Sequence, residues 1–413
     1  MKTGLAAALS LFAIIVLSAQ PQPRGDAPPA LAIRPLPTPA AADSGEPQLS
    51  TSAGGVILSW IERRGAQAAL RFAERIPGGW SAARDVASGA DWFVNWADVP
   101  SVMRLASGEL AAHWLQKSGA DTYAYDVRLS HSSDNGQTWS SSFTPHDDGT
   151  RTEHGFGSLF QMPGSGLGLV WLDGRAMIAG GHDGHGSGAM SVRFAAYSAD
   201  WTRTADVAVD PRVCECCPTA AAVTADGPIV AFRNRADDET RDIYVSRLEN
   251  GAWTEPRAVH HDGWIINACP VNGPMLSARG RDVVIAWFTA VGDQPRVFVA
   301  FSKDAGRTFA APIRLDDAGS LGRVDVELLP DGSAIASWIE VSDSRAELRV
   351  RRVSPSGMRS PAAAVSSLAA SRASGYPRLA AHGGDVTFAW TEAADGSTRV
   401  RTAVAAIPGA ASR

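Results

Sequence analysis

Lysine, cysteine and long apolar runs are all scarce in this chain of 413 residues. Only three of its 38 basic residues are lysines, and acidic and basic residues are interspersed to a net charge of −5. Because no basic stripe is present, we do not expect nucleic acid as a partner. The one long apolar run lies at residues 5–17, which is shorter than the roughly 20 residues that span a bilayer. With 45% hydrophobic residues, the chain is too apolar to be disordered.

The N-terminus has the pattern of a bacterial-type export signal. Lys2 precedes the apolar run, and small residues follow it at Ser18 and Ala19. No cysteine follows the run, which argues against a lipoprotein anchor. We therefore expect residues 1–19 to be a signal peptide, 20–42 to be a Pro/Ala-rich leader, and the protein to be secreted or periplasmic without a membrane span. An uncleaved anchor is the alternative.

One unit recurs seven times in the rest of the chain. Each copy contains an apolar strand that ends in an aromatic residue, namely Trp60, Trp114, Trp171, Phe232, Trp287, Trp338 and Trp390. A short strand precedes each of these and an alternating strand with a turn follows it. Four antiparallel strands in about 50 residues is the pattern of a propeller blade. The sequence therefore predicts an all-β, seven-bladed propeller over residues 43–413, with six blades as the alternative.

The seventh unit ends after its third strand, near Ile407. Residues 31–34, ahead of the first unit, form a strand-like segment without a blade. We expect this segment to supply the missing outer strand and close the ring, because closure removes the open sheet edges. A monomer is expected.

Two turns between third and fourth strands carry a sharper motif. Its residues are Ser132, Asp134, Gly136 and Trp139 in one copy, and Ser302, Asp304, Gly306 and Phe309 in the other. The motif resembles the Asp-box of the sialidase-like (BNR-repeat) propeller superfamily. The aspartate can cap turn amides, and the glycine can adopt a positive φ. The resemblance implies a sialidase-like propeller in which these turns lie on the face opposite the functional site.

The resemblance to sialidases also implies catalytic candidates. Enzymes of that family bind a substrate carboxylate with three arginines, use a tyrosine–glutamate nucleophile and an aspartate acid/base, and have six blades. Comparable positions or spare carboxylates in this chain are Arg323, Arg378, Tyr376, Asp98 and Glu153. The family's Arg-Ile-Pro motif is not matched, because the chain reads Ile33-Arg34-Pro35.

Thiols and imidazoles are expected to gather in the loops of the other face. Cys214, Cys216 and Cys217 precede the inner strand of the fourth blade, and Cys269 precedes that of the fifth. The third blade contributes His154 and a glycine-rich loop with His182 and His185. These ligand types suit copper(I) or zinc.

Disulfides are the alternative for these cysteines in an exported protein. Cys214–Cys217 with Cys216–Cys269 is the pairing with least strain. Thiol redox chemistry, or a nucleophilic cysteine, is a further possibility.

Three classes of function therefore remain open. They are a metal- or thiol-dependent exported protein, an exo-glycosidase, and a non-catalytic propeller that binds a glycan or a protein. Trp92, Trp96 and Trp264 are expected in the same loops, where they form a sugar-stacking platform or cover the core. His113 and His146 are expected to be structural or exposed.

Overall fold

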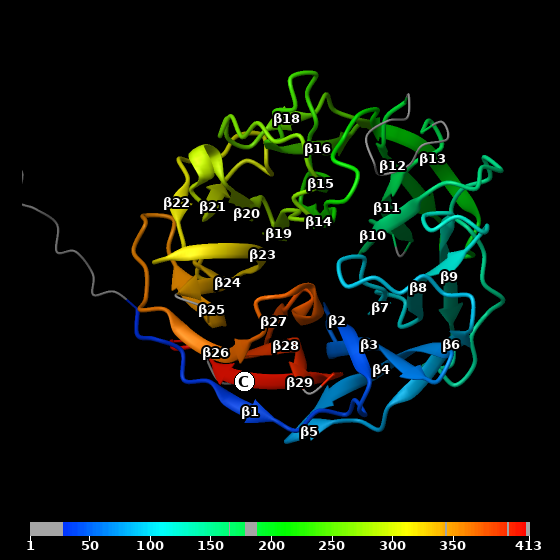
Figure 1. Ribbon diagram of the computed structural model, residues 1–413, viewed down its shortest axis with the longest axis horizontal. Helices are drawn as coiled ribbons and strands as arrows, with labels where there is room; N and C mark the ends of the chain where they lie inside the picture. The colour runs from blue at the N-terminus through cyan, green and yellow to red at the C-terminus, as the bar shows by residue number, and fades with distance from the viewer. Residues whose placement is uncertain (1–27, 165, 178–187, 343–344, 395, 410–413) are drawn as a thin grey trace, which may run out of the picture.

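Seven antiparallel sheets are arranged in a ring around a central axis (Figure 1). The computed structural model describes residues 28–164, 166–177, 188–342, 345–394 and 396–409. The expected signal peptide, His182 and His185 lie outside these residues. The seven sheets confirm the predicted all-β, seven-bladed propeller, and the six-bladed alternative is wrong. Among the described residues, no helix has the length and apolar character needed to cross a membrane.

In each blade the strands follow one another outward from the axis in chain order, except that blade 7 takes its outermost strand from the start of the chain (Figure 1). Blade 1 contains β2 (Ser44–Ser52), β3 (Gly55–Arg64), β4 (Gln67–Ile76), β5 (Gly79–Trp80) and β6 (Arg84–Gly89). Blade 2 contains β7 (Ser101–Arg104), β8 (Leu110–Lys117) and β9 (Tyr125–Ser132). Blade 3 contains β10 (His154–Gln161), β11 (Leu167–Asp173), β12 (Ser191–Tyr197) and β13 (Arg203–Asp210).

The remaining blades follow the same order. Blade 4 contains β14 (Ala220–Thr224), β15 (Gly227–Arg233), β16 (Ile243–Glu249), β17 (Ala252–Trp253) and β18 (Arg257–Ala258). Blade 5 contains β19 (Met275–Arg279), β20 (Asp282–Thr289), β21 (Arg296–Ser302) and β22 (Ile313–Arg314), with the short 3-10 helix η2 (Val291–Asp293). Blade 6 contains β23 (Gly319–Leu328), β24 (Ala334–Ser342), β25 (Arg345–Val353) and β26 (Ala363–Leu368). Blade 7 contains β27 (Arg378–His382), β28 (Asp385–Ala394), β29 (Ser397–Ala406) and β1 (Arg34–Leu36), and the 3-10 helix η3 (Arg372–Ser374) precedes it.

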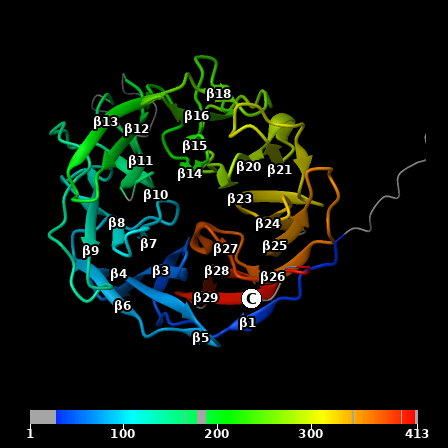
Figure 2. The same ribbon diagram turned by 180° about the vertical axis from the view of Figure 1, so that it is seen from behind.

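The ring is closed by the two ends of the described chain. Strand β1 pairs antiparallel with β29, with Arg34 opposite Val404 and Leu36 opposite Thr402 (Figure 2). The strand starts at Arg34, whereas the sequence suggested residues 31–34. Leu31 is buried against residues of blades 6 and 7 instead. Along the chain, Leu31 is therefore buried in the core before the backbone pairing of β1 begins at Arg34.

The repeated aromatic residues form the core between neighbouring blades. All seven are at most 7% exposed. The indole N–H of Trp60, Trp171 and Trp338 donates to a carboxylate two residues further along the strand, at 3.4, 2.9 and 3.1 Å. Residues two apart share one face of a strand. In these three repeats, one strand therefore supplies both the buried indole N–H and the carboxylate that accepts its hydrogen bond.

The two motif turns have the hydrogen bonds that the motif predicts. Asp134 Oδ1 accepts from the backbone N–H of Gln137 and Thr138 at 3.0 and 2.9 Å. Gly136 has a φ of 77°, and a Cβ there would lie 2.5 Å from the ring of Phe72. Asp304 likewise accepts from the N–H of Thr308 at 2.9 Å. In an antiparallel meander, such turns lie at the opposite end of the blades from the loops that enter the inner strands.

Candidate functional site

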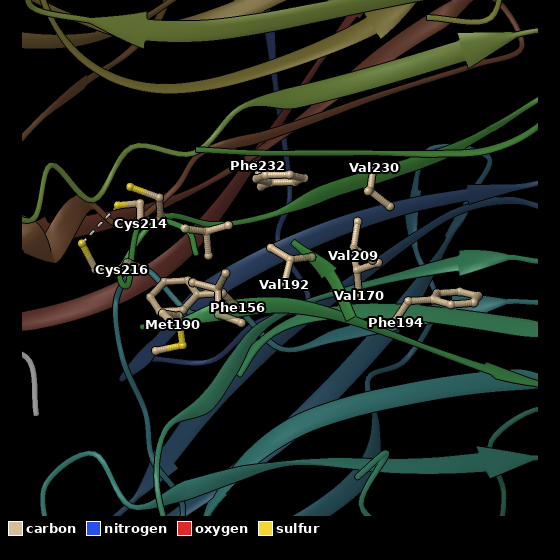
Figure 3. Close-up of a cluster of buried hydrophobic side chains, with 14 of the residues drawn as sticks. Phe156, Val170, Met190, Val192, Phe194, Val209, Cys214, Cys216, Val230 and Phe232 are labelled. Carbon is tan, nitrogen blue, oxygen red and sulfur yellow. Dashed lines mark hydrogen bonds between the residues drawn. The ribbon is translucent and has the colours of Figure 1, made fainter. Parts of the chain in front are cut away.

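Three cysteines lie together where the chain enters blade 4. The sulfurs of Cys214, Cys216 and Cys217 are all within 4.8 Å of one another, and the Cys214 and Cys216 sulfurs are 3.9 Å apart (Figure 3). All three residues are at most 5% exposed. They share a core cluster with Phe156 of blade 3 and with Tyr376, which immediately precedes blade 7. The thiol cluster therefore lies near the axis, at the end where the inner strands begin.

Cys269 approaches this cluster from the loop that enters blade 5. Its side chain is exposed, and its thiol contacts Cys216. Contacts with Cys214, Cys217 and Cys269 raise the pKa of Cys216 well above its usual value. Sulfurs from the loops that enter blades 4 and 5 are thus in contact, as expected from their positions ahead of the two inner strands.

The spacing of the sulfurs matches metal ligands better than a disulfide. None of the four cysteines forms a disulfide, so neither bond of the expected Cys214–Cys217 and Cys216–Cys269 pairing is present. Cys214 and Cys216, which are not one of the expected disulfide pairs, have sulfurs 3.9 Å apart. Metal–sulfur bonds of about 2.3 Å place ligands roughly 3.8 Å apart in a tetrahedral site and 4.0 Å apart in a trigonal one.

A buried guanidinium compensates the charge of this cluster. Arg241 is 2% exposed. Its Nη1 lies 3.5 Å from Cys214 Sγ and 3.2 Å from Glu215, and its Nη2 lies 2.8 Å from Glu239. Burial opposes ionisation of Cys214, but contacts with Cys216 and Cys217 and the charge of Arg241 together hold its pKa well below the usual range. The guanidinium of Arg241 therefore favours the ionised form of Cys214.

The two loops that carry the cysteines are fixed to each other by backbone contacts. Arg233, at the end of β15, is 1% exposed and donates to the carbonyls of Asn272, Arg241 and Phe288 at 2.8, 2.6 and 2.7 Å. Gly273 lies so close to Pro218 that a Cβ on it would be 1.9 Å from the Pro218 carbonyl oxygen. Blades 4 and 5 are thereby joined next to the thiols, so the cluster is preorganised.

Three sialidase-like candidates lie beside the thiols. The ring of Tyr376 stacks on Trp96 with centroids 5.9 Å apart, and the guanidinium of Arg378 lies 5.4 Å from the Tyr376 ring. Arg323 lies 4.6 Å above Trp96. The hydroxyl of Tyr376 donates to the carbonyl of Val271, and burial raises the pKa of this tyrosine far above its usual value. Tyr376 is therefore packed among neighbouring side chains near the axis, and its hydroxyl is already hydrogen-bonded.

The other two candidates meet at a tyrosine that the sequence analysis did not single out. The hydroxyl of Tyr125, at the start of β9, lies 2.7 Å from Glu153 and 3.3 Å from Asp98. Burial and the neighbouring charge of Glu153 raise the pKa of Asp98 to about 8. Because both contact one hydroxyl, these carboxylate oxygens are at most about 6 Å apart, a limit that allows the separation found in retaining glycosidases. All three residues are at most 5% exposed.

His154 lies apart from the cysteines, contrary to the expectation that it joins them. Its ring stacks on that of His146, with centroids 3.8 Å apart, and faces Asp126 of blade 2. Strand β10 has a bulge between Gly155 and Ser158, with a φ of 54° at Phe156. The bulge breaks the alternation of the strand, so Phe156 packs with the cysteines while His154 faces blade 2. His146, expected to be structural or exposed, is buried.

The three loop tryptophans do not form one platform. Trp92 stacks on Trp114 at 5.4 Å, Trp96 stacks on Tyr376, and Trp264 packs beneath the guanidinium of Arg233 at 4.9 Å. Each belongs to a different hydrophobic cluster. They cover separate parts of the core, which is the second of the two expectations.

Comparisons with known proteins identify the fold. No protein-family model matches the chain, and no curated protein matches it. Among solved structures, the polysaccharide lyase Uly1 aligns with a TM-score of 0.51 at 10% identity, over 93% of this chain and 94% of that one. An α-L-arabinanase from Penicillium chrysogenum aligns with a TM-score of 0.50 at 14% identity, over 78% and 97%.

A sialidase from Trypanosoma rangeli, solved with 2,3-difluorosialic acid, aligns with a TM-score of 0.50 at 11% identity. That alignment covers 87% of this chain and 59% of the sialidase. Identities this low describe the fold and leave the activity open. The protein has a β-propeller fold similar to that of these structures, with seven blades and a cluster of cysteines at one end of its axis.

Proposed function

We propose that this protein is an exported metal-binding propeller that holds copper(I) with the thiolates of Cys214, Cys216 and Cys217. The observation that carries the proposal is the convergence of three buried sulfurs within 4.8 Å, beside a buried arginine. Soft thiolate ligands select copper(I) and zinc among the biological metals. Export is proposed from the signal-like N-terminus.

The number of sulfurs that lie close together, three rather than four, favours copper(I) over zinc. The sulfurs of Cys214, Cys216 and Cys217 lie within 4.8 Å of one another, and the sulfur of Cys269, which contacts Cys216, lies outside that set. Copper(I) accepts three thiolates, but a structural zinc ion takes four ligands. Zinc would require Cys269 to move closer to Cys214 and Cys217.

A competition titration tests the proposal. The reduced protein should withdraw about one equivalent of copper(I) from a chromophoric chelator, and Cys214→Ser, Cys216→Ser and Cys217→Ser should each abolish or strongly weaken that withdrawal. Met190→Leu is the matched control, because it removes a buried thioether from the same core cluster without removing a thiol. Equal copper retention by the serine variants would refute the proposal. So would a wild-type protein that binds no copper(I) and instead forms reversible disulfides, which is the outcome of a thiol-redox role.

A glycoside hydrolase is the second candidate, because Tyr125, Glu153 and Asp98 form a close tyrosine–carboxylate group. The burial of all three argues against it, since a sugar needs access to the reacting groups. Hydrolysis of chromogenic glycosides that is lost in Glu153→Gln and retained in Cys214→Ser would support this candidate. A complete lack of turnover across sialoside and arabinoside substrates would remove it.

A further inference from the structure

A buried pair of histidines lies between carboxylates at the junction of blades 2 and 3. His146 belongs to the loop between β9 and β10, and His154 begins β10. The two rings are nearly parallel, at an angle of 11°. His146 is 6% exposed and His154 is fully buried. This pair is distinct from the thiol cluster and has no part in the proposed copper site.

The two edges of the stacked pair are directed at different aspartates. On one side, His146 Nε2 and His154 Nδ1 lie 3.6 and 3.3 Å from Asp126 Oδ1. On the other side, His146 Nδ1 and His154 Nε2 lie 2.9 and 3.3 Å from Asp148 Oδ2.

These close contacts leave the buried polar atoms unsatisfied. Among the described residues, none of the four ring nitrogens, nor Asp126 Oδ1 or Asp148 Oδ2, has a partner with hydrogen-bond geometry. Six such atoms in one place are unusual, because buried polar groups nearly always find a partner. A bound ion or a buried water molecule would complete such a group.

The two sides of the histidine pair differ in whether an arginine side chain is already present. Arg175 Nη2 lies 3.3 Å from Asp148, and its Nε lies 2.7 Å from Asp173. A metal ion on that side would face the guanidinium. Asp126 lies on the other side, where no arginine contacts it within the described residues, and it is the more exposed carboxylate, at 19% of its side chain. The Asp126 side therefore has no competing cation among the described residues, and part of its carboxylate side chain reaches the surface.

We infer that Asp126, His146 and His154 form a second metal site, for a divalent transition ion such as zinc or cobalt(II). Two imidazoles and one carboxylate are ligands of the kind that bind zinc while leaving a position open. Asp148 contacts the opposite nitrogens of both rings, which is the place of the carboxylate that orients metal-bound histidines.

Charge and distance agree with this assignment. Three aspartates, Asp126, Asp148 and Asp173, surround the pair with one arginine, Arg175, and a divalent ion would offset the surplus negative charge. Bonds of about 2.0–2.1 Å in a tetrahedral site place neighbouring ligand atoms roughly 3.3 Å apart, which is close to the observed 3.3 and 3.6 Å. The rings must tilt apart on binding, because a metal lies in the plane of each imidazole that it binds.

Cobalt(II) is the probe that separates this site from the thiol cluster. Cobalt bound by nitrogen and oxygen gives visible ligand-field bands alone, whereas thiolate ligands add a sulfur-to-cobalt charge-transfer band. Titration of the full-length wild-type protein should yield a component with ligand-field bands and no sulfur band, at about one equivalent. Asp126→Asn and His154→Gln should lose that component while any sulfur component remains. His260→Gln, which changes a half-exposed histidine paired with Asp262, should keep both.

Asp148→Asn provides a test that is specific to orientation. It should weaken cobalt binding by roughly 10- to 100-fold, whereas Asp147→Asn, at the exposed neighbouring residue, should leave it unchanged. If the ligand variants fail to fold, X-ray absorption of cobalt-loaded wild type decides, because imidazole scattering is expected. A wild-type protein with no cobalt component, or with sulfur-ligated cobalt alone, would overturn the inference. Either result leaves the copper(I) titration interpretable.

Discussion

Arg241 provides the most quantitative test of the thiol cluster. The guanidinium is buried, with Nη1 at 3.5 Å from Cys214 Sγ. At this separation and an effective dielectric constant of about 20, the attraction between unit charges is about 5 kcal/mol. Glu215 and Glu239 contact the same guanidinium and offset part of that attraction. We therefore expect Arg241→Met to weaken copper(I) binding by about 1.5–3 kcal/mol, which is roughly 10- to 100-fold.

The assay is copper(I) competition against a chelator of known affinity, at fixed pH and salt. Arg241→Lys should fall between wild type and Arg241→Met, because it keeps the charge but loses the planar contacts to the two glutamates. Arg235→Met is the matched control, since Arg235 contacts Glu215 and Glu239 without touching a cysteine. A folded Arg241→Met protein that binds copper(I) within threefold of wild type would refute the electrostatic argument. Equal losses in the Arg235 and Arg241 variants would refute it as well.

Three further predictions concern the scaffold. Burial lowers the pKa of His113 from 6.5 to about 4, so its contribution of about 3 kcal/mol is complete above pH 6.5 and lost as the pH falls toward 4; denaturant unfolding across this range should show a flatter acid limb in His113→Asn. Gly273→Ala places a Cβ against the Pro218 carbonyl and should cost about 1–3 kcal/mol, with a lower Tm and reduced copper stoichiometry, whereas an unchanged Tm would contradict the close packing. Tyr125→Phe removes the hydroxyl between two buried carboxylates and should cost about 1–3 kcal/mol, with a larger loss at pH 9 than at pH 6 because the pKa of Asp98 is about 8; a loss independent of pH would argue against ionisation of Asp98 in this range.

Much of the fold could be predicted because each blade repeats one physical requirement. An apolar strand ending in an aromatic residue must be buried on both faces, and seven such strands bury one another only by stacking around an axis. The closing strand was less predictable in position. Leu31 and Arg34 both fit a strand pattern, and only the packing of Leu31 shows where pairing begins.

The candidate site could be predicted only in part. The cysteines precede inner strands of adjacent blades, so topology alone brings them together. The bulge in β10 that turns His154 away leaves no clear signal in the sequence. Arg241 and Tyr125 were missed because their roles depend on partners more than 20 residues away, Cys214 and Asp98. The stacking of His146 on His154 was not foreseen, because His154 was expected beside the cysteines.

The most direct test of the central claim is X-ray absorption at the copper edge on protein loaded with one equivalent of copper(I). The account predicts a copper(I) edge and a first shell made of about three sulfurs near 2.3 Å, lost together in Cys216→Ser. A first shell of nitrogen and oxygen, or copper that washes from the wild-type protein while mass spectrometry finds Cys216 bonded to Cys269, would contradict it.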